Sequence, residues 1–185
     1  KYDRLAWKPG ETWQAEVWVN NSLTARDGWR WRAQVISLTG DLLVEAGGQI
    51  DLPDNAALAV DQLAWPVAAG VDAWLVMLSL HDEQDRIASR NTYAFSASVA
   101  APMKPLLAAP ETKLGVRKRE GALEIVNAGS APALFIQIEP LAGQWLIFGD
   151  NYFTLSPGEA HTVTAQGAGQ VSVKGWNTSA RKLKL

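Results

Sequence analysis

The sequence predicts an all-β protein built from two tandem β-sandwiches. Apolar residues alternate with polar residues along most of the chain, which is the period of half-buried strands. No window of about a dozen residues keeps a convincing helical period. Proline and alanine gather in residues 98–113, and about seven candidate strands lie on each side of that stretch. Together these observations predict two all-β units.

Three segments of the first half show the alternation most clearly. They are WQAEVWVNN at 13–21, WRWRAQVISL at 29–38 and AWLVMLSLHD at 73–82. In each, one row of side chains is apolar and the other is more polar, so one face of the strand is expected to be buried. The tryptophans that fall on the buried rows are Trp13, Trp29, Trp31 and Trp74.

Residues 52–65, LPDNAALAVDQLAW, are the nearest candidate for a helix. The Pro-Asp-Asn step at 53–55 could cap a short helical turn. However, Leu58, Val60 and Leu63 fit a strand about as well. We interpret the segment as a strand.

The stretch SVAAPMKPLLAAPETK at 98–113 is expected to be an extended, linker-like segment. Seven strands per unit is the number found in immunoglobulin-like (Ig-like) sandwiches. We therefore predict two Ig-like β-sandwiches, at residues 1–102 and 103–185. The strands of the second unit are expected near residues 112–118, 122–127, 133–139, 144–148, 152–155, 161–165 and 170–176, with GAGQ at 167–170 as a hairpin turn.

The composition excludes several classes of function. The net charge is −2, so nothing in it favours a nucleic acid or an anionic membrane as partner. The apolar runs are far shorter than the 18 or more residues of a membrane-spanning helix, and the polar start KYDR does not resemble a signal peptide. The chain has no cysteine, and its histidines are His81 and His161, which leaves little for a metal site or a catalytic triad.

A search for catalytic chemistry finds acids only in turns. A glycosidase needs two carboxylates at a fixed separation. The densest acidic cluster is HDEQDR at 81–86, where Asp82, Glu83 and Asp85 could bind Ca²⁺. A solvated hairpin turn carries the same residues and is the preferred interpretation. We predict no catalytic residue, no metal site and no cofactor.

Candidate contact residues lie on the polar rows of the first unit. Trp18 shares its row with Glu16, and Arg30 and Arg32 share the polar row of another strand. An aromatic ring with arginines nearby is a candidate surface for sugar binding or for docking of another domain. The alternative is that Trp18 is one of the isolated exposed aromatics that are common on protein surfaces.

The stretch GDNYFTLSPGEAHTV at 149–163 is predicted to form a strand, a turn and a second strand. Asp150 and Asn151 can bond their own main chain and start a strand cleanly. Pro157 and Gly158 fit the central positions of a type II turn, because proline presets φ and glycine accepts a positive φ.

The same stretch, followed by VSVKGWN, resembles the last Ig-like domain of β-mannosidases and exo-β-D-glucosaminidases in glycoside hydrolase family 2. The first half is similar to the Ig-like domain that precedes it in those enzymes, through WKPGETWQAEVWVNN and LHDEQDRIASRNTYAFS. The second-half residues that match the signature of the family are Asp150, Asn151, Tyr152, Phe153, Pro157, Gly158, Glu159, Gly175, Trp176 and Asn177.

The resemblance implies a non-catalytic part of a larger enzyme. The family members are retaining glycosidases whose catalytic glutamates, or close equivalents, lie on a (β/α)₈ barrel. A barrel of about 250 residues does not fit in this chain, so no catalytic residue carries over. The expected parent is a bacterial β-mannosidase-like enzyme, or next an exo-β-glucosaminidase, in the periplasm or outside the cell. The expected partners are its barrel and its other domains.

Two alternatives stay open at this point. The chain could be a pair of autonomous carbohydrate-binding modules, in which exposed aromatics bind glycan directly. It could also be a surface stalk of Ig-like repeats, which the distinct sequences of the two halves make less favourable.

Overall fold

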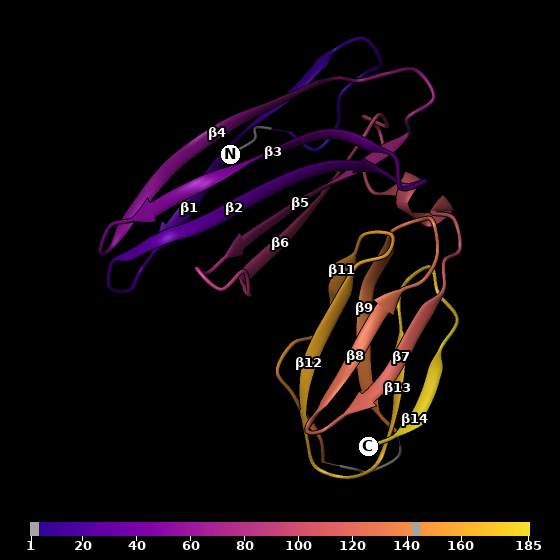
Figure 1. Ribbon diagram of the computed structural model, residues 1–185. Helices are drawn as coiled ribbons and strands as arrows, with labels where there is room; N and C mark the ends of the chain where they lie inside the picture. Colours follow the sequence, from indigo (N-terminus) through magenta and orange to yellow (C-terminus); the bar gives the residue numbers. More distant parts are fainter. Residues whose placement is uncertain (1–3, 142–144) are drawn as a thin grey trace. The chain divides into compact units, whose positions relative to one another are not determined.

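The computed structural model describes residues 4–141 and 145–185. The chain divides into two compact units, Lys1–Ala108 and Ala109–Leu185. Each unit is a sandwich of antiparallel sheets (Figure 1), which confirms the predicted fold class. The expected boundary between residues 102 and 103 lies just ahead of the short 3-10 helix η1 (Lys104–Ala108), which is grouped with unit 1.

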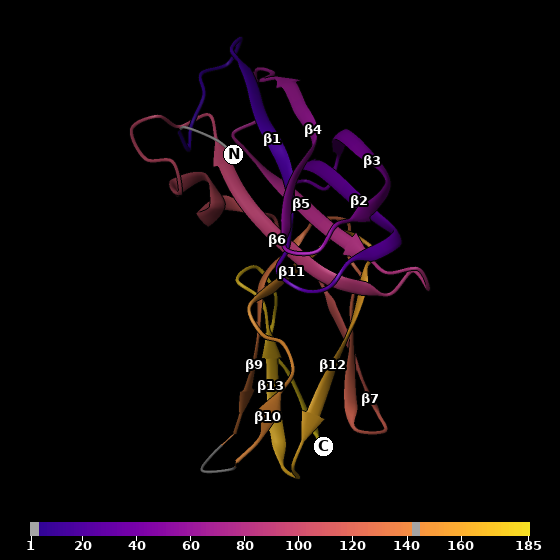
Figure 2. The ribbon, with the colours of Figure 1, turned by 90° about the vertical axis from the view of Figure 1, so that its left-hand side faces the viewer.

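Unit 1 pairs a two-stranded sheet with a four-stranded one. The strands are β1 (Thr12–Asn21), β2 (Arg26–Ser37), β3 (Leu42–Leu52), β4 (Ala56–Pro66), β5 (Ala73–His81) and β6 (Ile87–Ser96). The small sheet has the order β1-β4 and the larger sheet has the order β3-β2-β5-β6 (Figure 2). The segment that was ambiguous between helix and strand is β4, so the strand interpretation is confirmed.

A β-bulge explains why β4 looked partly helical. Val17 pairs with Asp61 and Trp18 pairs with Ala59, so Val60 is an extra residue in β4. A bulge places two residues of one strand opposite one residue of its partner and shifts the alternation. Leu58, Val60 and Leu63 can therefore all pack on the same core although their spacing is not strictly two.

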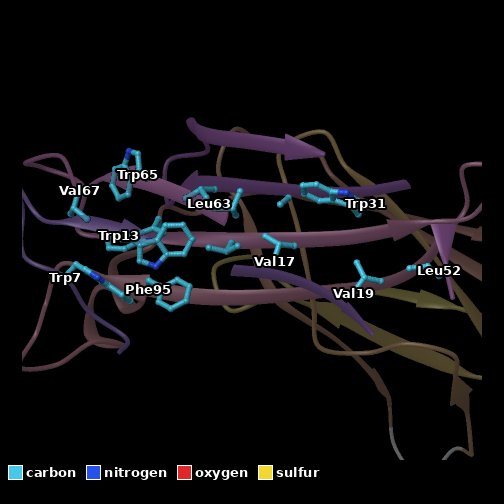
Figure 3. Close-up of a cluster of buried hydrophobic side chains, with 14 residues drawn as sticks. Trp7, Trp13, Val17, Val19, Trp31, Leu52, Leu63, Trp65, Val67 and Phe95 are labelled. Atoms are coloured by element: carbon cyan, nitrogen blue, oxygen red, sulfur yellow. The ribbon is translucent and has the colours of Figure 1, made fainter. Parts of the chain in front are cut away.

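The core of unit 1 is aromatic. Rings from β1, β4, β5 and β6 meet between the two sheets, and Figure 3 shows Trp7, Trp13 and Phe95 next to one another at one end of the cluster. Trp74 is fully buried, and its ring centroid lies 5.0 Å from that of Trp65. Trp13, Trp31 and Trp74 are buried and Trp29 is partly buried against the same cluster, as the alternation predicts.

Unit 2 is a sandwich of two four-stranded sheets. Its strands are β7 (Leu114–Arg119), β8 (Ala122–Asn127), β9 (Ala133–Pro140), β10 (Ile147–Phe148), β11 (Phe153–Leu155), β12 (Ala160–Gln166), β13 (Gln170–Lys174) and β14 (Arg181–Lys184). The sheets have the orders β10-β12-β8-β7 and β11-β9-β13-β14 and lie face to face (Figure 1). Their inner faces enclose an aliphatic core that includes Leu123, Ile125, Ile136 and Val173.

The described residues form six strands in unit 1 and eight in unit 2, where the sequence predicts about seven in each. The strand missing from the prediction is β14, whose sequence is RKLK. Cationic residues suit an edge strand, where they discourage pairing with another chain, but they hide its apolar period. Leu183 nevertheless packs against the core of unit 2.

The turn at 167–170 is not a hairpin turn, contrary to the prediction. It joins β12 to β13, which belong to different sheets. The Ser156–Glu159 turn likewise passes from β11 in one sheet to β12 in the other. The predicted order of strand, turn and strand is correct there, but the two strands face each other across the sandwich rather than pairing.

Candidate binding surfaces

Trp18 lies on the outer row of β1, as predicted. Its side chain is 44% exposed, and its indole N–H donates a hydrogen bond to Glu16 Oε2 at 3.0 Å. Its neighbours Val17 and Val19 point into the core. Trp18 and Arg32 both line a groove of about 180 Å³ that also touches Trp31 and residues 78–80 and 89–91.

Arg30 and Arg32 project from the outer face of the four-stranded sheet. Antiparallel partners point to the same face, so Arg30 shares this face with Gln49 and His81, its partners on β3 and β5. Both guanidinium groups are paired with acids. Arg30 Nη2 lies 2.6 Å from Asp85 Oδ1, and Arg32 Nε donates to Glu45 Oε1 at 2.7 Å.

These two arginines border a hollow of about 740 Å³ on that face. Gly47 and Gly48 lie on the β3 side of it, and a Cβ at Gly47 would stand 2.9 Å from the backbone oxygen of Trp31. Asp85 and Glu45 offset the cationic charge, so the hollow is not a basic patch. Trp18 and Arg32 therefore line the groove, and Arg30 and Arg32 border the hollow. The three predicted contact residues do not share a single site.

The acidic turn at 81–86 is a hairpin between β5 and β6, which confirms the preferred interpretation. Asp82 Oδ1 accepts hydrogen bonds from the backbone N–H groups of Gln84 and Arg86 at 3.0 and 2.9 Å. The hydrogen bond from the Arg86 side chain, first among several causes, holds the pKa of Asp82 below its usual range. Within the described ranges, no three His, Cys, Asp or Glu side chains gather as metal ligands.

The signature residues of unit 2 include two asparagines that act as backbone partners. Asn151 accepts a hydrogen bond from Ile138 N at 2.8 Å and donates to Ile138 O at 3.0 Å, so its side chain takes the place of a strand residue beside β9. Asp150 accepts the N–H of Asn151 at 2.7 Å and lies 2.8 Å from His161 Nε2. Phe153 is buried and packs its ring edge-to-face with His161.

The Asn177 side chain joins the start of β9 to the segment around Pro110. Its side chain donates to Pro110 O and Pro132 O at 2.7 and 2.9 Å and accepts from Leu134 N at 3.0 Å. It is 7% exposed, so these backbone groups are satisfied away from water. Gly175 lies close by, and a Cβ there would stand 2.9 Å from Leu134 O.

The turn at Pro157 and Gly158 has the expected conformation. Gly158 has φ 76°, and the N–H of Glu159 donates to Ser156 O at 3.1 Å, as in a type II turn. The Glu159 carboxylate accepts the N–H of Ser156 at 2.9 Å. Two backbone hydrogen bonds, from Gly158 N to Asn127 O and from Asn127 N to Glu159 O, attach the turn to the end of β8.

Two other signature residues, Tyr152 and Trp176, are exposed, at 63% and 59%. Together with Phe135 they border a hollow of about 630 Å³ that Gln137, Lys174, Gly175 and Thr178 also line. Phe135 and Tyr152 have φ values of 48° and 61°, a conformation that costs roughly 1–3 kcal/mol for a residue other than glycine.

Sequence reasoning did not single out Phe135, and it treated Tyr152 and Trp176 as structural. A signal for Phe135 was present, because it alternates with Leu134 and Ile136 and so shares the outer row of β9 with Gln137.

In the described part of the chain, no helix is long and apolar enough to cross a membrane.

Comparisons with known families give a consistent assignment of the two units. Residues 14–98 match the mannosidase Ig/CBM-like domain, and residues 107–182 match the Ig-fold domain of mannosidases. The chain belongs to the mannosidase Ig-like domain families. The resemblance to the C-terminal Ig-like domains of family 2 glycoside hydrolases is thereby confirmed.

Solved structures show the same fold for this mannosidase-type Ig-like pair. The exo-chitosanase CsxA of Amycolatopsis orientalis superposes with a TM-score of 0.74 at 20% identity, over 92% of this chain and 25% of that one. The β-D-mannosidase of Dictyoglomus thermophilum superposes with a TM-score of 0.67 at 13% identity, over 90% of this chain and 20% of that one. The pair thus spans about a quarter or less of the enzymes it matches. A sequence comparison with curated proteins finds no match.

Proposed function

We propose that this chain is the non-catalytic accessory part of a family 2 β-glycosidase, packing on the catalytic barrel and shaping the rim of its pocket. The observation that supports this most is that both units match mannosidase-type domains that occupy only 20–25% of the solved enzymes. A β-mannosidase-like parent is the first choice, and an exo-β-glucosaminidase is the second.

The acids of unit 1 support a structural role. Asp82 organises the β5–β6 turn, Asp85 pairs with Arg30, and Glu45 pairs with Arg32. Each of these carboxylates is thus engaged with a cation or with backbone N–H groups. A retaining glycosidase instead needs two carboxyl groups about 5–5.5 Å apart that flank a sugar-binding cleft.

The test uses the open reading frame that contains this sequence. We expect the frame to encode a (β/α)₈ barrel, and the enzyme with this chain to hydrolyse an aryl β-mannoside or an aryl β-glucosaminide. Deleting residues 1–185 should lower kcat/KM and the melting temperature, because the barrel loses a packing surface. A frame without a barrel, or a deletion that leaves both quantities unchanged, would overturn the proposal.

A pair of autonomous carbohydrate-binding modules is the second candidate. The exposed ring of Trp18 beside a groove favours it. The groove of about 180 Å³ is small, however. Of its two tryptophans, Trp18 is exposed and could stack on a sugar, whereas Trp31 is buried in the core. In unit 1 the accessory role therefore remains the better explanation.

A further inference from the structure

Three aromatic side chains of unit 2 gather on one surface. Phe135 lies on β9, Tyr152 lies just before β11, and Trp176 follows β13, so three separate segments contribute to it. Their exposed fractions are 40%, 63% and 59%, and all three line the same hollow. Single exposed aromatics are ordinary, but rings that converge on one concavity mark a binding site. We call Phe135, Gln137, Tyr152, Lys174, Trp176 and Thr178 the aromatic face.

The backbone beneath these rings is held in place. The N–H of Tyr152 donates to Asn151 Oδ1 at 3.1 Å, and the Asn151 side chain is itself bound to both backbone groups of Ile138. The N–H of Trp176 donates to Leu134 O at 2.7 Å, next to the Asn177 bridge. The face is therefore formed before any ligand arrives, which lowers the entropy that binding must overcome.

The backbone of Phe135 is fixed in a similar way. Its N–H donates to Thr154 Oγ1 at 3.2 Å. Phe135 and Tyr152 both have positive φ values. A residue other than glycine keeps such a backbone angle only where the surrounding structure imposes it. Strained residues of this kind cluster at ligand sites, and here both carry a ring that borders the hollow.

The polar groups around the rings can both donate and accept hydrogen bonds. Gln137 Nε2 lies 3.3 Å from the Tyr152 hydroxyl and 2.6 Å from Glu139 Oε1. Lys174 Nζ lies 3.3 Å from Glu139 Oε2, so the cation and the anion offset each other. A surface of this composition suits a ligand that has many hydroxyl groups and no negative charge. A phosphate or a nucleic acid would instead need an excess of positive charge on the protein.

The size of the hollow also fits a small ligand. Its volume of about 630 Å³ lies within the range of about 300–1,000 Å³ found for small-molecule sites, which combine aromatic walls with a few placed polar groups. A pyranose ring has an apolar C–H face that packs on an aromatic ring and an edge of hydroxyl groups that bond polar side chains. Both aromatic rings and polar side chains line this hollow.

We propose that the aromatic face of unit 2 is a binding site for an oligosaccharide of β-linked neutral or amino sugars. The choice of sugar rests on the proposed function, whose candidate parents act on β-mannosides or β-glucosaminides. Trp176 and Tyr152 stack on sugar rings, and Gln137 and Lys174 bond the hydroxyl groups.

The experiment is an NMR titration of the isotope-labelled 185-residue chain with mannohexaose, and separately with a chitosan hexamer. We expect saturable shifts of the Trp176 indole N–H signal and of backbone signals at residues 135–137 and 174–178. Trp176→Ala should weaken binding by at least about tenfold. Tyr152→Phe keeps the ring and should retain most of the affinity.

Trp145→Ala is the matched control, since it removes an exposed tryptophan of unit 2 that does not line the hollow and should change the affinity by less than about twofold. A spectrum in which the signals of Val171 and Val173 are unchanged shows that the Trp176→Ala variant is folded. Shifts of the same size in wild type and Trp176→Ala, or no saturable shift with either hexamer, would overturn the proposal.

A protein partner is the competing occupant of the aromatic face, with a second copy of the chain as its simplest form. Sedimentation that reveals a dimer in the wild type and a monomer in Trp176→Ala would overturn the saccharide proposal in favour of self-association. Because these measurements use the chain alone, a failure here is distinct from a failure of the proposed function, which is decided by the activity of the enzyme with and without residues 1–185.

Discussion

The core of unit 1 is rich in aromatic rings, whereas the core of unit 2 is mainly aliphatic and unit 2 also buries amide side chains. In unit 1, Trp7, Trp13, Trp65, Trp74 and Phe95 form one cluster with ring centroids 5.0–6.4 Å apart. The indole N–H groups of Trp13 and Trp74 have no hydrogen-bond acceptor among the described residues. Edge-to-face ring contacts stabilise this core beyond the area that it buries.

Unit 2 uses its tryptophans and its polar groups in the opposite way. Trp145 and Trp176 are 92% and 59% exposed, while Asn127 is fully buried. Asn127 donates to Ala131 O and Leu155 O and accepts from Thr112 Oγ1, so one amide joins three segments of the sandwich. Seven of the nine tryptophans lie in unit 1, where all but Trp18 are buried or partly buried, whereas both tryptophans of unit 2 are exposed.

The largest expected effect is at the centre of the aromatic cluster. Trp74→Ala should destabilise unit 1 by about 3–5 kcal/mol, because a fully buried ring is lost and the neighbouring rings cannot fill the cavity. Urea unfolding followed by NMR separates the signals of the two units. Unit 2 signals should keep their midpoint, and a change of less than about 1 kcal/mol in unit 1 would be inconsistent with an aromatic core.

The second effect tests the buried amide of unit 2. Asn127→Ala should destabilise unit 2 by about 2–3 kcal/mol, because the Ala131 and Leu155 carbonyl groups lose their donor in the interior. Asn127→Asp keeps the acceptor oxygen but removes the donor, so it should be nearly as harmful. If the aspartate variant unfolds at the wild-type midpoint, the donated hydrogen bonds do not matter.

The third effect concerns the turn that joins the two sheets of unit 2. Gly158→Ala should cost about 1 kcal/mol, because the φ of 76° is unfavourable for alanine although no atom lies within 4 Å of the new Cβ. Gly115→Ala is the control. Its Cβ would make an ordinary contact at 3.9 Å and its φ is not positive, so the change should be neutral or stabilising. Equal melting temperatures for wild type and Gly158→Ala would refute the turn assignment.

The smallest effect is expected at Trp18. Trp18→Ala should change the stability of unit 1 by about 0.5 kcal/mol or less, because the side chain lies outside the core. Its indole N–H donates a hydrogen bond to Glu16, which lies on the same outer row of β1. Thermal unfolding measures this directly. A loss comparable to that of Trp74→Ala would show that the ring packs against something that the outer row of β1 does not reveal.

Alternation alone predicted the sandwich class and the rows that hold Trp13, Trp31 and Trp74, because a strand with one buried face must alternate. It could not predict which sheet each strand joins. The turn after β11 contains Pro157 and Gly158, and the turn after β12 contains Gly167 and Gly169. Such residues also suit hairpin turns, yet both turns cross between sheets. The bulge in β4 depends on its pairing with β1, which the sequence of β4 does not contain.

The candidate site was less predictable than the fold. The turn residues Pro157 and Gly158 could be placed because their backbone preferences are local. The aromatic face could not, because it assembles Phe135, Tyr152 and Trp176 only when three strands of one sheet are in register. The exposure of Tyr152 and Trp176 follows from the neighbouring asparagines, which turn inward and leave the rings outside.

The most direct test of the account is the activity of the purified chain on aryl β-mannosides and aryl β-glucosaminides. The accessory role predicts no turnover above a buffer blank with either substrate, because in this account the two catalytic carboxylates lie on the barrel and not in these 185 residues. Asp82, Asp85 and Glu45 are engaged in a turn and in ion pairs. Turnover that is lost when one of the chain's own acids is replaced, as in Asp85→Asn, would contradict it.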